Sequence, residues 1–310
     1  MKRSGSWIGG IAVLAALGAR DVANAACTAQ VVGDQFVISG CTGIVVQSGD
    51  VTVESGNPKV RNGTGFTDAV NGKGNVIVGY DKTNTVPGFP TDKTGSHNIV
   101  IGDQHSYTSY GGVVTGFQNS VSGAYANVLG GRLNRSSGPF ANVTGGQYGQ
   151  AKGGSSMVLG GWNNEAQTNF TTVAGGSDNV ATTSTPSDPF SISYAAVTGG
   201  YNNEARGVYA AVSGGANNTA TGASASVCGG SANDALGDYS SVTGGYLNDA
   251  SGTFATVSAG NANTAFADYS SVSGGNSNRA DGNRSTVSGG FQRTCSGTYD
   301  WCAGTLLQDQ

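Results

Sequence analysis

Residues 241–255 have the sequence SVTGGYLNDASGTFA, and residues 256–270 repeat its pattern as TVSAGNANTAFADYS. Both 15-residue units carry valine second, glycine fifth, asparagine eighth, alanine tenth and an aromatic residue fourteenth. A short fixed period is typical of solenoids, in which each repeat forms one coil and stacks on the next. The period therefore predicts an all-β fold, a parallel β-roll or β-solenoid.

The same pattern extends over most of the chain. The only long interval between coils contains nine extra residues within 183–193, which predict a loop. Residues 75–79 and 98–102 have the composition of degenerate coils. Twelve coils are predicted, with their first residues at Gly112, Asn127, Asn142, Met157, Thr172, Ala196, Ala211, Ser226, Ser241, Thr256, Ser271 and Thr286.

Alternation within a coil predicts two strands and two bends. In the first strand, valine at position 2 and glycine at position 4 face inward, and positions 1 and 3 face outward. In the second strand, asparagine at position 8 and alanine at position 10 face inward. Glycines at positions 5 and 12 are expected at the bends, where positive φ costs glycine little. The predicted core ladder, with amides bonded from coil to coil, includes Val113, Val128, Val143, Val158, Val212, Val227, Asn119, Asn134, Asn203, Asn218, Asn233 and Asn248.

The N-terminal residues have the features of a signal peptide. Lys2 and Arg3 precede an apolar run over residues 7–17, and the small residues 23–25 offer a cleavage site after Ala25. We therefore expect a secreted or cell-surface protein, held at the outer membrane through a partner if at all. No later segment has the length of apolar sequence that a membrane helix needs.

Five segments follow from these patterns. They are a signal peptide (1–25), an N-terminal β-rich cap region (26–74), degenerate coils (75–111), a twelve-coil roll (112–300) and a C-terminal tail (301–310). Charged residues make up 11% of the chain and its formal net charge is −4. Because there is no basic cluster, we expect no nucleic-acid partner.

The cysteines predict a local disulfide at each of the two ends. In an exported protein, the close pairs Cys27–Cys41 and Cys295–Cys302 are expected to form local disulfides. Cys228 stands alone at position 3 of a coil, where neighbouring coils carry serine or threonine. We expect Cys228 to be a small buried or half-buried residue.

The segments 75–79 and 98–102 have the form Asn-x-Val-x-Gly or Asn-x-Ile-x-Gly and resemble the YadA-like head of trimeric autotransporter adhesins. The resemblance implies a left-handed β-roll, a homotrimer and a role in cell adhesion. Later coils differ by carrying glycine at position 4, as at Gly130, Gly145 and Gly214, where that family usually has isoleucine. We expect this glycine to narrow the core. We expect this chain to differ from the family also in having neither its heptads nor its membrane barrel.

Residue types argue against catalysis. The chain has two histidines, His97 and His105, so a nucleophile paired with a base is not expected. Acidic residues recur at position 9, at Glu165, Glu204 and Asp234 among others, and are expected to be solvated. We therefore predict no enzyme activity, no metal site and no cofactor.

Aromatic residues make a binding role the better hypothesis. They recur at positions 6 and 14, and unbroken alternation would place the position 14 rings outside. A bend near position 15 would instead turn these rings into the roll. The candidate binding face consists of Tyr209, Tyr239, Phe254, Tyr269, Trp162, Tyr201 and Tyr246.

Large aliphatic residues at the outward position 3 predict self-association, because an exposed apolar stripe favours burial against another copy. The candidate trimer contact is Val100, Val114, Leu129 and Leu159.

The leading functional hypothesis is an adhesin-like protein that binds a polymer, host matrix or surface by many weak contacts. One alternative is ice binding, because triplets such as Thr256-Val257-Ser258 place two hydroxyls on one face, as in insect antifreeze β-solenoids. Another alternative is a structural protein similar to phage tail fibres.

Overall fold

A computed structural model of the chain describes residues 28–32, 35–39, 59–183 and 192–303. The chain divides into two compact units, Met1–Pro58 and Lys59–Gln310. In the first unit, β1 (Thr28–Val32) and β2 (Gln35–Ser39) pair antiparallel. The predicted signal peptide lies outside the described residues.

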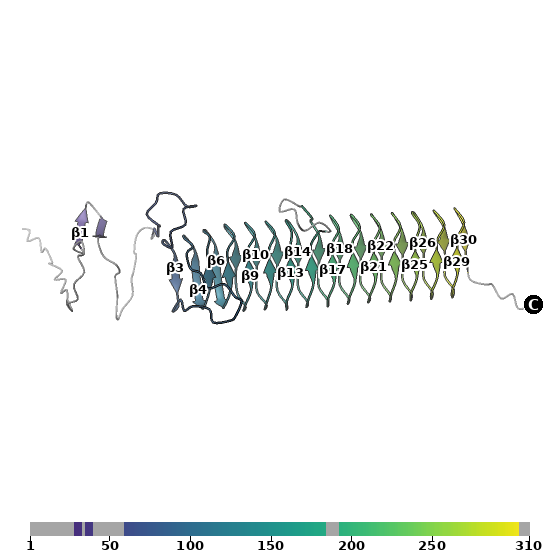
Figure 1. The fold of residues 1–310 in the computed structure, drawn as a ribbon, viewed down its shortest axis with the longest axis horizontal. Coiled ribbons are helices and arrows are strands. Elements are labelled where there is room, and N and C mark those ends of the chain that lie inside the picture. The colour runs from purple at the N-terminus through teal and green to yellow at the C-terminus, as the bar shows by residue number, and fades with distance from the viewer. Residues whose placement is uncertain (1–27, 33–34, 40–58, 184–191, 304–310) are drawn as a thin grey trace, which may run out of the picture. The chain divides into compact units, whose positions relative to one another are not determined.

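The second unit is a β-solenoid of two parallel sheets whose strands stack along one axis (Figure 1). The 15-stranded sheet contains, in order, β3 (Val76–Val78), β4 (Ile99–Asp103), β6 (Val113–Phe117), β8 (Asn127–Val128), β10 (Asn142–Val143), β12 (Met157–Val158), β14 (Thr172–Val173), β16 (Ala196–Val197), β18 (Ala211–Val212), β20 (Ser226–Val227), β22 (Ser241–Val242), β24 (Thr256–Val257), β26 (Ser271–Val272), β28 (Thr286–Val287) and β30 (Trp301–Cys302). The 13-stranded sheet contains β5 (Ser106–Tyr107), β7 (Ser120–Val121), β9 (Arg135–Ser136), β11 (Gln150–Ala151), β13 (Glu165–Ala166), β15 (Val180–Ala181), β17 (Glu204–Ala205), β19 (Thr219–Ala220), β21 (Asp234–Ala235), β23 (Asp249–Ala250), β25 (Thr264–Ala265), β27 (Arg279–Ala280) and β29 (Thr294–Cys295). The predicted fold class is confirmed.

Each regular coil contributes two very short strands, at positions 1–2 and 9–10. Val143 lies opposite Val128 on one side and Val158 on the other, so like residues stack at 15-residue steps. Backbone bonds continue beyond the strands, as from the Leu129 N–H to the Val143 carbonyl at 2.9 Å. The backbone is thus hydrogen-bonded along the axis over most of each coil.

The core is narrow and consists of small aliphatic side chains. Valine at position 2 and alanine at position 10 are almost fully buried, and so is the alanine or serine at position 15. Each buried valine stabilises the fold by roughly 1.5–3 kcal/mol. Since the two sheets meet across only these side chains, stability depends on the number of coils in the stack.

The first regular coil has a register that the sequence pattern missed. Val113 lies opposite Asn127 and Val114 opposite Val128, while Phe117 still pairs with Arg132. The coil from Val113 to Ala126 is therefore one residue shorter than its successors. Val114 is buried and Val113 is half-buried, so the prediction that Val113 belongs to the core ladder is wrong.

The glycines at positions 5 and 12 are required for different reasons. Gly215, at position 5, has a φ of 88°, and a Cβ there would lie 2.2 Å from the Gly230 carbonyl oxygen. Gly222, at position 12, does not have a left-handed φ, but its Cβ would lie 2.0 Å from the Gly237 oxygen. The second left-handed bend falls at position 14 instead, as at Tyr209 with a φ of 62°. The expected positive φ at position 12 is wrong.

Glycine at position 4 does not narrow the core. A Cβ on Gly145, Gly214 or Gly229 would have no atom within 4 Å, so these positions border open space. The expectation that position 4 faces the core is wrong for these coils, because the chain turns away after the two-residue strand.

Asparagine at position 8 faces inward, as predicted, and binds mainly backbone atoms. The Asn134 N–H donates to Asn119 Oδ1 at 2.8 Å, and Asn134 Oδ1 accepts from the Gly149 N–H at 2.7 Å. Asn134 Nδ2 donates to the carbonyls of Gly130 and Gly146 at 3.1 and 3.0 Å. Each amide therefore ties two coils together, and the expected chain of amide-to-amide bonds is largely replaced by amide-to-backbone bonds.

The extra residues between two coils leave the stack in register. Thr172 still lies opposite Ala196, and the Asn203 N–H donates to Asn179 Oδ1 at 2.9 Å. Most of the predicted loop, residues 184–191, lies outside the described residues.

A disulfide joins the two sheets in the last coil. Cys295 stacks on Ala280 at position 10, and Cys302 stacks on Val287 at position 2. Their Cα atoms are 6.0 Å apart and the sulfurs are bonded, as predicted. The predicted Cys27–Cys41 pair lies outside the described residues.

The expected burial of Cys228 is wrong, because this free cysteine is exposed at the outward position 3. Within the described ranges, no helix has the length and apolar character needed to cross a membrane.

Candidate functional site

A row of exposed rings runs along one connection of the coils. Position 14 lies in the tight turn that returns the chain to the 15-stranded sheet, closed by bonds such as the one from the Ala255 N–H to the Gly252 carbonyl at 3.0 Å. The rings lie outside the roll, as the alternation predicted. We call this set the ring row: Tyr125, Phe140, Phe170, Tyr194, Tyr209, Tyr239, Phe254 and Tyr269.

Consecutive rings of the ring row stack face to face. The centroids of Tyr239 and Phe254 are 4.7 Å apart with an interplanar angle of 5°, and those of Phe254 and Tyr269 are 5.1 Å apart at 10°. Tyr194 and Tyr209 stack at 5.2 Å and 4°. Inside a stack the neighbours cover the ring faces, so only ring edges and hydroxyls remain for another molecule.

The backbone cost of these aromatic residues is considerable. Each has a left-handed φ near 60°, which costs a residue other than glycine about 1–2 kcal/mol. A stacked aromatic pair contributes about 0.5–1.5 kcal/mol beyond burial. The two effects roughly cancel, so fold stability alone does not account for aromatics where glycine or asparagine would be unstrained. The ring row is therefore the leading candidate binding surface.

The position 6 aromatics form a second, separate row on the other connection of the coil. Trp162, Tyr201 and Tyr246 are exposed, but non-aromatic residues occupy the coils between them. The seven residues predicted as one binding face thus belong to two rows with different chemistry. Only the position 14 row forms stacks within the described residues.

The outer surface of the 15-stranded sheet changes character along the axis. In its first coils, positions 1 and 3 expose aliphatic side chains of 42–56% accessibility: Val76, Val78, Ile99, Ile101, Leu129 and Leu159. Val100 and Val114 are 1% exposed, so their prediction as trimer contacts is wrong. Both occupy position 2, because the register in this region differs by one residue from the predicted one.

Hydroxyl groups cover the later coils of the same sheet. Ser226 Oγ donates to Ser241 Oγ at 3.1 Å, and the hydroxyls of Ser271 and Thr286 are 3.0 Å apart. Each of these bonds joins the hydroxyls of two neighbouring coils. The sheet thus has an aliphatic half and a hydroxyl half.

His105 occupies position 8, where later coils carry asparagine, and is 1% exposed. Its Nδ1 accepts a bond from the Asn119 N–H at 3.2 Å, and its Nε2 donates to the Ile101 carbonyl at 3.1 Å. Oδ1 and Nδ2 of asparagine have these two roles in the next coils. Burial lowers the pKa of His105, because desolvation disfavours the imidazolium. His105 is therefore a neutral member of the ladder.

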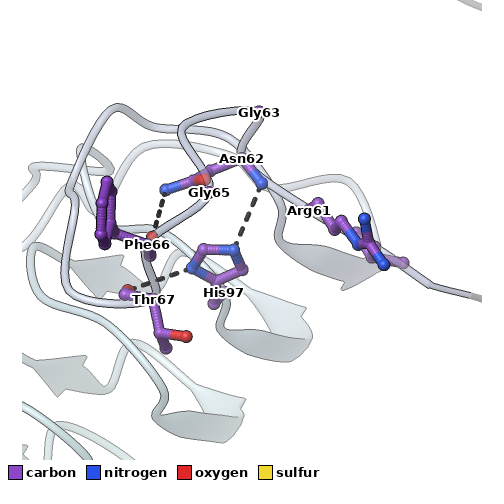
Figure 2. A pocket seen from close by; sticks show the side chains of 8 residues that line it. Arg61, Asn62, Gly63, Gly65, Phe66, Thr67 and His97 are labelled. Carbon is purple, nitrogen blue, oxygen red and sulfur yellow. Dashed lines mark hydrogen bonds between the residues drawn. The ribbon is translucent and has the colours of Figure 1, made fainter.

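His97 fastens a loop that borders a cavity of about 470 Å³ (Figure 2). The backbone N–H of Asn62 donates to His97 Nε2 at 3.2 Å, and His97 Nδ1 lies 3.2 Å from the Thr67 carbonyl oxygen. Phe66 and Arg61 also line the cavity. Both ring nitrogens of His97 have partners, so the structure gives this histidine a role in holding residues 62–67.

The acidic residues of position 9, expected to be solvated, are half-buried: Glu165, Glu204, Asp234 and Asp249. Lys152 pairs with Glu165, and Arg206 pairs with Glu204. Asp234 lies opposite Asp249 in the next coil. Burial and the neighbouring carboxylate raise the pKa of Asp234. In the described part of the chain, no group of three or more His, Cys, Asp or Glu side chains has an arrangement that could hold a metal ion.

Arg284, which lies in line with the ring row, was not predicted as a functional residue. Arg284 takes the ring position in its coil, and its guanidinium lies between Tyr269 and Tyr299. The sequence pattern does contain a sign of this role, because an arginine stands at position 14, where most coils carry an aromatic residue.

Comparison of the sequence with protein-family models and with curated proteins finds no match.

Proposed function

We propose that this chain is a non-catalytic, adhesin-like protein that acts outside the cytoplasm and binds a polymeric, matrix or cell surface through its repeated side chains. The ring row carries the proposal. It presents aromatic edges and hydroxyls along the stacked coils, at a backbone cost that ring stacking only roughly offsets, so fold stability alone does not account for the rings. Regular spacing suits a repetitive ligand, because many weak contacts act together.

The proposed exterior location has two supports, the signal-peptide features of residues 1–25 and the disulfide of the last coil. The proposed absence of catalysis is supported by the two histidines, whose ring nitrogens all have partners.

Matched sets of ring replacements test the proposal. Serine occupies position 14 at residues 155 and 224, so Tyr194→Ser, Tyr209→Ser, Tyr239→Ser, Phe254→Ser and Tyr269→Ser, combined, keep a residue that the turn already accepts. We expect this variant to lose at least tenfold in binding to a glycan array or matrix-coated sensor. The control, Tyr201→Ala with Tyr246→Ser on the other row, should keep its binding. Equal binding by all three proteins would contradict a role for the ring row.

Ice binding is the second candidate, because the hydroxyl half of the 15-stranded sheet has ordered rows. Serines and threonines stack in register, as Ser241 does on Thr256. Two pairs of these hydroxyls bind one another rather than facing solvent alone, and Leu129, Met157 and Leu159 interrupt the face in earlier coils. Thermal hysteresis of the purified chain would support ice binding, and its absence would favour the adhesin-like function.

We also propose self-association through the aliphatic half of the same sheet. An exposed apolar patch of this kind on a single chain favours burial against further copies. The resemblance to trimeric adhesin heads implies three chains. The contact proposed from the structure consists of Val76, Val78, Ile99, Ile101, Leu129 and Leu159.

A further inference from the structure

Arg284 shows which chemical group fits between two aromatic rings at position 14. Its guanidinium carbon lies 4.9 Å from the Tyr269 ring centroid and 5.4 Å from the Tyr299 centroid. Nη1 donates to the Tyr299 hydroxyl and to Asn283 Oδ1, both at 3.2 Å. A planar cation thus replaces one ring in the stack, with a ring face on each side.

Two other coils lack a ring at position 14. Ser224 lies between Tyr209 and Tyr239, and Ser155 lies between the coils of Phe140 and Phe170. Rings two coils apart are separated by about 10 Å, twice the strand spacing. A serine side chain is too short to fill that space. Each gap therefore leaves two ring faces uncovered by the chain itself.

The exposure of the flanking rings agrees with an open gap at Ser224. Tyr209 and Tyr239 are 61% and 55% exposed, whereas Phe254, which has a ring on both sides, is 43% exposed. Their free faces are parallel to the stacks behind them, since the interplanar angles there are only 4–5°. The gap has the form of a slot one ring wide.

A carboxylate stands beside the Ser224 slot. Asp238 precedes Tyr239, and its Oδ1 accepts a bond from the Ala223 N–H at 2.8 Å, which fixes the carboxylate at the slot. Asp268, which precedes Tyr269, accepts a bond from the Thr253 N–H at 2.9 Å in the coil before it, and so lies on the side of Tyr269 away from Arg284. At the Ser155 slot an uncharged amide, Asn169, takes this place. The Ser224 slot thus has two flanking rings, as at the chain's own guanidinium site, and a carboxylate in addition.

We propose that the slot at Ser224 binds the guanidinium of an arginine side chain from a protein partner. The flat cation stacks between Tyr209 and Tyr239, and Asp238 supplies the counter-charge. This inference names the ligand chemistry for the ring row and so rests on the proposed function.

The test uses the full chain and the peptide acetyl-Gly-Gly-Arg-Gly-Gly-amide, with lysine and citrulline in place of arginine as controls. Stacking should move the arginine δ-methylene proton signals upfield in NMR titrations, because of the two ring currents. Citrulline is planar but uncharged and lysine is charged but not planar, so both peptides should bind at least tenfold more weakly.

Ser224→Arg fills the slot with the chain's own arginine, in the turn geometry that Arg284 already has. We expect this variant to keep its melting temperature and to lose at least tenfold in affinity for the arginine peptide. Ser155→Arg, the matched control, should bind as the wild type does. Undiminished binding by Ser224→Arg, or equal binding of the citrulline peptide, would overturn the site. If the ring-row serine variant still loses surface binding, the proposed function stands without this site.

Discussion

At the scale of single residues, two adjacent glycines of one coil have opposite surroundings. Gly214 borders open space, whereas Gly215 has a left-handed φ of 88° and packs against the next coil. The same pair recurs along the stack. Only glycine therefore fits at position 5, whereas position 4 has room for a larger side chain.

Alanine replacements should separate the two positions. Gly215→Ala combines backbone strain with a clash against the Gly230 carbonyl, so the free energy of unfolding should fall by about 3 kcal/mol or more. Gly214→Ala should change it by less than about 0.5 kcal/mol. Chemical denaturation followed by circular dichroism measures both, and equal losses would show that the register is wrong.

His105→Asn should make the chain less sensitive to acid. The folded pKa lies below the ordinary value of 6.5, so the unfolded chain binds more protons than the folded chain as the pH falls through 6.5. The contribution of neutral His105 to the free energy of unfolding is therefore fully present above pH 6.5. Below pH 6.5 the free energy of unfolding falls by at most about 1.4 kcal/mol per pH unit, until His105 protonates in the folded chain. Asparagine keeps both hydrogen-bonding roles without titrating.

Melting temperatures at pH 7.5 and pH 5.0 test this prediction. We expect the two proteins to be similar at pH 7.5 and the wild type to lose more stability at pH 5.0. Because His97 is present in both proteins, it does not contribute to the difference between their losses of stability. An identical loss in the two proteins would show that His105 ionises freely in the fold.

The sequence predicted inward and outward residues well where one periodic register holds. Val128 and Asn134 recur at 15-residue steps, and the stacking of identical side chains places them inside. Val113 and Val114 were interchangeable in the pattern because both are valines, so the short coil was invisible. The left-handed turn at residues such as Tyr209 was also unpredictable, because position 12 offered glycine and aromatic residues rarely adopt that conformation.

At the scale of elements, the strands are too short to be stable individually. A two-residue strand such as β22 depends on its neighbours β20 and β24 for hydrogen bonds. The last strands, β29 and β30, have a neighbouring coil in their sheet on one side only within the described residues. The Cys295–Cys302 disulfide lies at this end and joins the two sheets there.

Cys295→Ala with Cys302→Val should loosen the end of the roll and leave its centre unchanged. Alanine and valine are the usual residues at positions 10 and 2, so packing is kept and only the covalent link is lost. A short disulfide loop contributes on the order of 2–3 kcal/mol. Amide hydrogen exchange should therefore accelerate about tenfold or more in residues 279–302 and stay constant near residue 220.

Cys228→Ser is the matched control for this experiment, because Cys228 is free and exposed. It should exchange as the wild type does. Unchanged exchange in the double variant would show that the last coil is held by packing alone.

At the scale of the whole molecule, the two halves of the 15-stranded sheet predict where copies meet. Leu129→Glu with Leu159→Glu places charges in the aliphatic half and should shift a trimer to monomers. Thr243→Glu with Ser258→Glu adds the same charge at position 3 of the hydroxyl half and should leave the proposed trimer intact. Sedimentation velocity at micromolar concentration measures the mass, and a monomeric wild type would contradict the trimer.

The interrupted coil has a consequence for protein engineering. On the two sides of the insertion, the Thr182 N–H still donates to the Ala205 carbonyl at 2.8 Å and Ser193 Oγ donates to the Thr182 carbonyl at 2.7 Å. The framework therefore accepts additional sequence at this connection while the strands before and after it stay in register. Foreign peptides grafted here, and at the equivalent connection of other coils, would be displayed in a row with a pitch of about 4.8 Å per coil. Such a framework would hold epitopes or catalytic groups apart at chosen multiples of that distance.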